Sequence, residues 1–321
     1  MPLLEINTGP DGPRLHRGGQ RPDTALQDAL RRTGPVIIMV HGFKFAPGHA
    51  RDCPHGHILS LTPRRNWKAL SWPRGLGFGG DAPDEGLAVA FGWSARGTLW
   101  QAYGRAPDAA RQLAKLIGAI HRIDPQRPVH MVAHSLGARV VLGAVAAVPA
   151  GSIGRVILLN GADYADTAQR ALTSAAGAGA ELLNITTREN DLFDFLFERL
   201  IQPPRRGARC LAEHFPARPN TLHIQLDHPA TRSALSQLGF DVAQDATRIC
   251  HWSAYLRPGL MEVYRALLRD PEHLSLGRLR THLCHDPDPR WSRLWPRTAP
   301  PALTARAWLS SVGGVIGTVQ R

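Results

Sequence analysis

Short apolar segments recur along the chain and are separated by stretches with helical periodicity. Runs rich in Val and Ile occupy residues 36–40, 88–91, 129–133, 155–159, 182–186 and 222–226. Near-continuous apolarity over four to six residues is typical of a strand that is buried on both faces. The pattern therefore predicts six strands of one sheet.

Helical periodicity fills three of the remaining stretches. Residues 107–122 place Leu113, Ile117 and Ile120 on one face, and Pro107 is a start signal for this helix. Residues 136–148 are rich in Ala, Val and Leu, and residues 258–269 carry a second apolar stripe. Strands that alternate with helices indicate the α/β class, with a mostly parallel sheet that helices cover on both faces.

The alternating pattern also suggests how the chain is organised. We expect one α/β domain over residues 34–270, an N-terminal segment over 1–33 and a C-terminal extension over 271–321. Residues 46–84 are rich in Gly and Pro, and we interpret them as a loop-rich insertion after the first strand. Long insertions of this kind often help to build a binding site. The small-residue tail, residues 302–321, is open to either a short helix or irregular structure.

A serine between the third strand and the following helix is the first candidate for chemistry. The motif is Ala133-His134-Ser135-Leu136-Gly137, a variant of G-x-S-x-G in which alanine replaces the first glycine. In the strand–turn–helix context, this motif exposes a serine hydroxyl above the sheet as a nucleophile. The alternative is a serine that only caps the helix.

The end of the first strand supplies a second element of a nucleophilic site. It reads Val40-His41-Gly42-Phe43. An oxyanion hole uses the backbone N–H after the nucleophile and another from the loop that follows such a strand. We therefore predict the N–H groups of Phe43 and Leu136 as the two donors.

A serine nucleophile needs a base and an orienting acid, in the chain order serine, acid, histidine. The segment after the strand at 182–186 contains Glu189, Asp191 and Asp194. We predict Asp191 as the acid, with Asp194 as its competitor. These carboxylates could instead stabilise the start of a following helix.

Seven histidines follow Asp191, and two of them suit the base. His251 lies in a loop just before the last predicted helix, and His228 follows the strand at 222–226. We predict His251 as the base and retain His228 as the alternative. The leading hypothesis is a triad of Ser135, His251 and Asp191.

Four blocks of the sequence carry a resemblance to a known family. They are residues 36–43, 91–94, 103–108 and 132–139. In this order they resemble the α/β-hydrolase superfamily and, within it, a bacterial group related to the DUF900 esterase/lipase-like proteins. The resemblance implies the α/β-hydrolase fold and a serine hydrolase, carboxylesterase-like or lipase-like, that acts on a small ester or related acyl substrate. Residues 46–84 and the chain after residue 270 depart from the family pattern.

Composition and charge add an alternative function. The chain is 43% hydrophobic, which excludes wholesale disorder, and its formal net charge is +12. Only three of the 38 basic residues are lysines. The arginine pairs 31–32, 64–65 and 205–206 would suit a non-catalytic protein of this fold that binds acidic partners. No aromatic residues alternate with them, which argues against a site for single-stranded nucleic acid.

The sequence predicts neither a cofactor nor a metal site. The G-x-G-x-x-G match at residues 75–80 lacks the flanking strand and helix of a dinucleotide site. Cys53, His55 and His57 lack a second pair of ligands. The absence of an apolar signal-peptide core predicts a cytoplasmic location. Association with a membrane surface through residues 302–319 stays open, and no oligomeric state is predicted.

Overall fold

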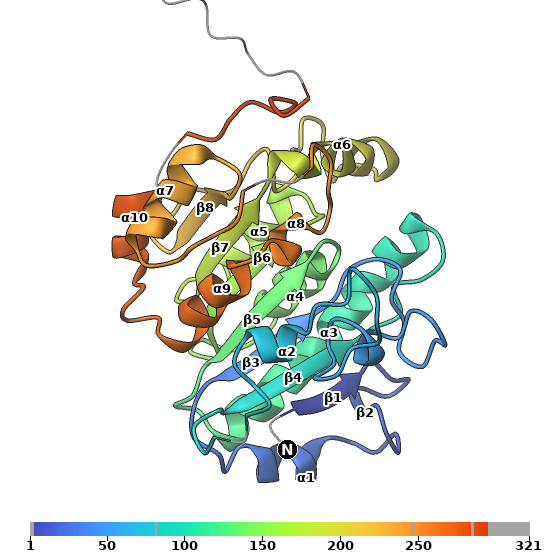
Figure 1. Ribbon diagram of the computed structural model, residues 1–321. Coiled ribbons are helices and arrows are strands. Elements are labelled where there is room, and N and C mark those ends of the chain that lie inside the picture. Colours follow the sequence, from blue (N-terminus) through green and yellow to red (C-terminus); the bar gives the residue numbers. More distant parts are fainter. Residues whose placement is uncertain (1–2, 81, 245–246, 284–285, 295–321) are drawn as a thin grey trace, which may run out of the picture.

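One eight-stranded sheet organises the computed structural model, which describes residues 3–80, 82–244, 247–283 and 286–294 (Figure 1). Its order is β2-β1-β4-β3-β5-β6-β7-β8, and only β2 runs antiparallel to its neighbour. The strands are β1 (Leu3–Asn7), β2 (Arg14–Leu15), β3 (Val36–Val40), β4 (Leu87–Gly92), β5 (Val129–His134), β6 (Ile153–Leu159), β7 (Glu181–Thr186) and β8 (Thr221–Gln225). All six predicted strands are confirmed.

The N-terminal segment differs from the expectation, because it belongs to this sheet. Strand β1 pairs in parallel with β4, with Leu3 opposite Ala88, and β2 closes that edge. Leu3–Asn7 mixes apolar and polar residues, of which only Leu3 and Ile6 are buried, because this strand lies next to the sheet edge. Residues 3–7 therefore lack the continuous apolar pattern that predicts the inner strands.

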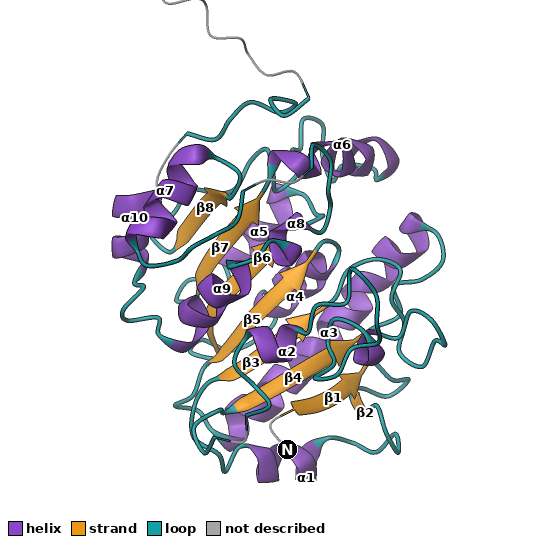
Figure 2. Ribbon diagram, viewed as in Figure 1, coloured by secondary structure: helices purple, strands orange, loops and turns teal. Residues whose placement is uncertain are grey.

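Helices cover both faces of the sheet (Figure 2). Helices α1 (Asp23–Ala29), α3 (Leu99–Ile123), α4 (Gly137–Val145) and α5 (Ala165–Leu172) pack on one face. The other face carries α2 (Trp72–Gly75), α7 (Pro229–Gln237), α8 (Ser253–Leu256), α9 (Leu260–Arg269) and α10 (Leu276–Leu283). Along β3, Val36, Ile38 and Val40 enter the first core, whereas Ile37 and Met39 enter the second. This alternation explains why the strands read as continuous apolar runs.

Helix α3 begins eight residues earlier than its proline predicted. Thr98 caps it, and a reciprocal capping box joins the side chains and backbones of Thr98 and Gln101. Two N–H groups at the helix start are thereby satisfied. Pro107 lies inside the helix, where it removes one backbone donor. The capping box and the packing of the long apolar face outweigh that loss.

The insertion at 46–84 lies over the face of the sheet that carries α8 and α9. It contains the short 3₁₀ turn Pro54–Gly56 and helix α2. The ring of Trp72 is fully buried and meets Tyr255 edge to face at 5.3 Å. Gly75 lies so close to Met261 that a Cβ would approach its side chain to 2.7 Å. The insertion therefore forms a wall beside the segment that contains His251.

The C-terminal extension also contributes to the folded body. Helix α10 packs beside α7 against β8, and its Leu276, Leu279 and Leu283 enter the core. Residues 286–294 lie on α6 (Asp191–Leu200), where Arg290 pairs with Glu198 at 2.8 Å. The predicted tail at 302–321 lies outside the described residues. No described helix combines the length and the apolarity needed to cross a bilayer.

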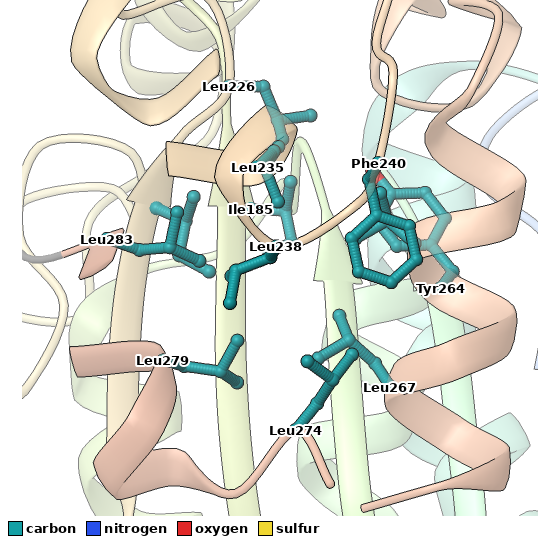
Figure 3. Close-up of a pocket in the computed structure, with 12 residues that line it drawn as sticks. Ile185, Leu226, Leu235, Leu238, Phe240, Tyr264, Leu267, Leu274, Leu279 and Leu283 are labelled. Carbon is teal, nitrogen blue, oxygen red and sulfur yellow. The ribbon is translucent and has the colours of Figure 1, made fainter. Parts of the chain in front are cut away.

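Figure 3 shows an apolar cavity between β7, β8 and the helices α7, α9 and α10. Its volume is about 10 Å³, roughly the room of a single water molecule. Side chains such as Ile185, Leu235, Phe240, Leu267 and Leu279 point into it. A cavity this small is an imperfection of core packing and has no room for a substrate.

Candidate active site

Ser135 occupies a strained turn between β5 and α4. Its φ is +54°, in the left-handed region that residues with a Cβ rarely adopt. The Ser135 N–H donates to Leu159 O at 3.0 Å, and the Ser135 carbonyl accepts from Ala138 N and Ala162 N. These three hydrogen bonds hold the backbone in its strained conformation. Strain that the surroundings enforce in this way concentrates at functional sites.

Two glycines allow the serine turn to approach β3. A Cβ on Gly42 would lie 2.7 Å from Ser135 Cβ, and a Cβ on Gly137 would lie 2.7 Å from the carbonyl oxygens of Val40 and His41. Contacts that short cannot form without a shift of the backbone. The glycines of the two sequence motifs are thus required by the same close approach.

We expect Gly42→Ala to lower both activity and stability, because the new methyl group displaces Ser135. Overpacking of this kind costs about 1–3 kcal/mol, and a displaced nucleophile costs about 10²-fold in kcat/KM. Ester hydrolysis and the melting temperature measure the two effects. Gly104→Ala is the matched control, since Gly104 is exposed on α3 with no atom within 4 Å of its added Cβ. Equal kcat/KM values of Gly42→Ala and Gly104→Ala would contradict the assignment of Ser135 as the nucleophile.

His41 anchors the loop that follows β3. Its Nε2 accepts from Trp93 N at 3.1 Å, its Nδ1 donates to Gly42 O at 2.9 Å, and its carbonyl accepts from Trp93 Nε1. Burial lowers the pKa of His41 to about 4. The ring is therefore neutral at pH 7, and it acts as a structural support for this loop.

The backbone N–H groups of Phe43 and Leu136 differ from that of Lys44 in their hydrogen bonding. Among the hydrogen bonds of the described residues, neither N–H has an acceptor. The next N–H, that of Lys44, donates to Ala95 O at 2.9 Å and so belongs to the scaffold. Paired N–H groups without acceptors beside a serine could stabilise a developing oxyanion.

His251 is held in place through its own backbone carbonyl. This oxygen accepts from His134 Nε2 at 3.0 Å and from Asn160 Nδ2 at 3.2 Å. His134 directly precedes Ser135, and the centroids of its ring and the His251 ring lie 4.6 Å apart. The ring of Phe193 stacks on His251 at 4.7 Å. Long-range contacts thus bring His251 to the end of the strand that carries Ser135.

No direct hydrogen bond joins the Ser135 hydroxyl to the His251 ring within the described part of the chain. Catalytic hydrogen bonds are often long without a substrate and shorten in the reacting complex. Burial, followed by the charges of His134 and Lys68, holds the pKa of His251 well below 6.5. A neutral imidazole is the form that can accept a proton.

The side chain that orients His251 is Asn190, which the sequence analysis did not consider. His251 Nδ1 lies 2.6 Å from Asn190 Oδ1. Because an amide oxygen only accepts hydrogen bonds, this contact assigns the ring proton to Nδ1 and leaves Nε2 unprotonated. Asn190 is buried at the end of the turn after β7, directly before the predicted Asp191. The residue after β7 that contacts His251 is thus Asn190, one position before the predicted acid Asp191.

Asp191, the predicted acid, faces away from His251. Its Oδ1 pairs with Arg188 Nη1 at 3.2 Å, and its Oδ2 accepts from Trp291 N at 2.6 Å. Asp191 is the first residue of α6. Consecutive helical residues point about 100° apart, so the Asp191 side chain points in a different direction from that of Asn190. Burial raises the pKa of Asp191 to about 6. Its contacts fit a role in holding α6 against the C-terminal segment.

Asp194, the competitor of Asp191, lies one helical turn after Asn190 on α6. Burial raises the pKa of Asp194 to about 7, against the opposing charges of Arg188 and Arg290. Among the described residues, Asn190 makes the side-chain contact to His251, and Asp194 does not.

The other two candidates have structural partners. Glu189 pairs with the buried Arg257 at 2.8 Å, and its backbone carbonyl accepts from Cys250 N. It thereby fastens the loop that contains His251. His228 caps helix α7 by accepting from Ala230 N at 3.2 Å, and it lies 4.0 Å from Asp288. These contacts place His228 in the scaffold of α7.

The features that suggested other functions are dispersed. The arginine pairs follow α1, lie within the insertion and follow α6, and two of their members pair locally: Arg31 with Asp28 and Arg205 with Asp166. Among the described residues, no group of three or more potential ligands could hold a metal ion. Cys53 and His55 instead contact His16 and Asn7.

No family model and no curated protein matches the chain. Similar solved structures include the phospholipase PlaB from Legionella pneumophila in complex with thio-NAD, at 12% identity over 55% of this chain and 43% of that chain, with a TM-score of 0.29. Aspergillus fumigatus lipase B is 14% identical over 79% and 64%, at 0.34. Pyrococcus horikoshii acylaminoacyl peptidase is 11% identical over 82% and 40%, at 0.33. The chain covers less than two thirds of each of these proteins.

The TM-scores of these structures are low, so the fold is identified from the strand order and the connections of this chain. A mostly parallel sheet has helices on both faces, and a strained serine turn joins β5 to α4. The residues that follow β3, β5, β7 and β8 then meet at the carboxyl edge of the sheet. This combination is the α/β-hydrolase fold.

Proposed function

We propose that the protein is a serine hydrolase that cleaves a carboxylic ester through an acyl-enzyme. The observation that carries this proposal is the strained turn of Ser135, beside two backbone N–H groups without acceptors. A turn that only began a helix would also leave N–H groups free, but it would not need the strained φ of Ser135. The base and its orienting amide supply the remaining parts.

The first half-reaction forms the acyl-enzyme. Ser135 Oγ attacks the ester carbonyl carbon while His251 Nε2 accepts the hydroxyl proton. The carbonyl oxygen becomes an oxyanion, which the N–H groups of Phe43 and Leu136 stabilise. When the C–O bond of the ester breaks, the imidazolium returns the proton to the departing alcohol.

The second half-reaction releases the acid. Water attacks the acyl-enzyme carbonyl, and His251 accepts a proton from this water and then returns it to Ser135 Oγ. Asn190 is a positioning residue in both halves, because it keeps the proton of the neutral ring on Nδ1. An amide lacks the charge with which a carboxylate stabilises the imidazolium, so this histidine has a lower pKa than it would beside an aspartate.

The direct test is a chain-length panel of p-nitrophenyl esters, from acetate upward, with the wild type, Ser135→Ala and His251→Ala. The proposal expects wild-type turnover of at least part of the panel, and its loss in both variants. Wild-type turnover that both variants retain in full would refute it. The acyl length with the highest kcat/KM would also describe the substrate.

We expect an unusually acidic lower limit to the pH–rate profile. His251 accepts a proton only when neutral, and its pKa is held well below 6.5. Since a lowered pKa keeps the ring neutral to lower pH, kcat/KM should stay constant below pH 7 and fall only once pH passes below 6.5. The midpoint of the acid limb of kcat/KM is the measurement. A midpoint above 6.5 would contradict this expectation.

A further inference from the structure

Two of the three lysines in the chain lie at the candidate site. Lys44 directly follows the proposed oxyanion donor Phe43, and Lys68 belongs to the insertion. The Lys68 Nζ lies 3.2 Å from the centroid of the Trp252 ring, next to His251, and 4.7 Å from that of Trp67. The insertion thus brings the Lys68 ammonium group beside Trp252, and the backbone of Lys44 lies one residue past the proposed donor Phe43.

The positions of the two lysines are defined by their surroundings. Lys44 has a φ of +77°, and its N–H is bonded to Ala95 O. Trp67 meets Trp252 edge to face at 5.5 Å, so that Lys68 lies against both rings. Trp67 is 70% exposed, so this side of the ring pair faces solvent.

The charges of the two lysines act on one another and on the site. Burial is the largest cause that lowers the pKa of Lys68, and the Lys44 charge adds to it. Burial likewise lowers the pKa of His251 and of His57, with a smaller contribution from the Lys68 charge. Within the described ranges, neither lysine has a carboxylate within 4.0 Å. Most cations of this chain are arginines, several of which form ion pairs. Two ammonium groups without a nearby carboxylate attract anions.

We propose that Lys44 and Lys68 form an anion subsite, which selects esters that carry a carboxylate or phosphate group close to the scissile bond. This inference rests on the proposed hydrolase function and names its substrate class. A compact ammonium suits either anion as a point charge. The Trp252 ring beneath Lys68 would pack on the short chain between the ester and the anion.

The kinetic test compares two esters of one skeleton, mono-(4-nitrophenyl) glutarate and its methyl-capped diester. The readout is the ratio of their kcat/KM values. We expect a wild-type ratio above one, reduced about threefold to fivefold by Lys44→Gln or Lys68→Gln, as for a partly exposed ion pair. The double variant should lose more, and added salt should lower the wild-type ratio. An equal ratio in wild type and double variant would overturn the proposal.

Two further variants separate charge from structure. Lys68→Arg keeps the charge and should keep most of the preference for the charged ester. Lys115→Gln removes the remaining lysine, which lies on α3 at a different cleft, and should leave the ratio unchanged. A ratio that Lys115→Gln lowers as much as Lys68→Gln does would assign the effect to net charge and overturn the subsite.

A binding measurement keeps this inference separate from the hydrolase proposal. Glutarate and inorganic phosphate are titrated calorimetrically into Ser135→Ala, with and without the two lysine substitutions. Lysine-dependent binding without turnover of either ester or of any ester of the p-nitrophenyl panel would support the subsite and refute the hydrolase. Normal turnover of the capped ester, without any lysine dependence of ratio or binding, would refute only the subsite. The stronger ligand of the two distinguishes carboxylate from phosphate recognition.

Discussion

Ser135→Ala is expected to abolish ester hydrolysis, with kcat lower by a factor on the order of 10⁵ or more. The hydroxyl is the only group in the proposed mechanism that forms a covalent bond, so no neighbour can replace it. A residual rate above that in water would come from the oxyanion donors and from substrate binding. The measurements are ester turnover and labelling by a fluorophosphonate probe, detected by intact mass.

The protein offers a matched control for this substitution. Ser236 is exposed on α7, and Ser236→Ala should retain both turnover and labelling. The expected result is one added probe per wild-type and Ser236→Ala chain, and none on Ser135→Ala. Alanine at position 135 tolerates φ of +54° no better than serine, so the melting temperature should hardly change. Equal labelling of all three proteins would refute the nucleophile.

The second large effect is expected for substitution of Asn190. Asn190→Ala removes the only described side chain that contacts His251 Nδ1, which frees the ring to rotate and to place its proton on Nε2. We expect a loss of about 10²-fold in kcat/KM, as for other misplaced catalytic groups. A loss in kcat with little change in KM would identify orientation of the base as the cause.

Asn190→Asp is the informative counterpart. An aspartate also accepts from Nδ1 and adds the charge that stabilises the imidazolium. We expect this variant to retain activity at neutral pH, with the acid limb of kcat/KM shifted to higher pH because the pKa of His251 rises. Asp194, whose pKa is already raised to about 7, would then hold its proton more tightly.

Asp191→Asn is the control for Asn190, because Asp191 is its neighbour and faces Arg188 and Trp291 instead. This variant should lower the melting temperature and leave the midpoint of the pH profile unchanged. If Asp191→Asn moved the acid limb and Asn190→Asp did not, Asp191 would be the orienting group after all. Asp191→Asn and Asn190→Asp together thus test whether Asp191, predicted from the sequence, or Asn190, seen in the structure, orients His251.

Local sequence was enough to single out Ser135 as the proposed nucleophile and Phe43 and Leu136 as its proposed donors. Ser135, Leu136 and Phe43 each lie within three residues of a strand end, and strands buried on both faces are recognisable as apolar runs. The glycines at 42 and 137 report the close approach directly. Strand β1, next to the sheet edge, was missed for the complementary reason, since partly exposed residues give a weaker apolar pattern.

The orienting residue could not be read in the same way. Asn190, Asp191 and Asp194 occupy the end of one turn and the start of α6, and consecutive helical residues point about 100° apart. A carboxylate is the usual partner of a catalytic histidine, so sequence reasoning favoured an aspartate. Only the direction of each side chain shows that the amide meets His251.

The sequence by itself determined the class of the sheet, the serine turn and the paired N–H groups, because these depend on burial patterns and on glycines within a few residues. Tertiary structure alone decided which polar side chain contacts His251, and it brought Lys68 of the insertion to the ring of Trp252, next to His251. Those contacts join residues 61 positions apart in the case of Asn190 and His251. Their geometry depends on the packing of whole elements, which no local pattern encodes.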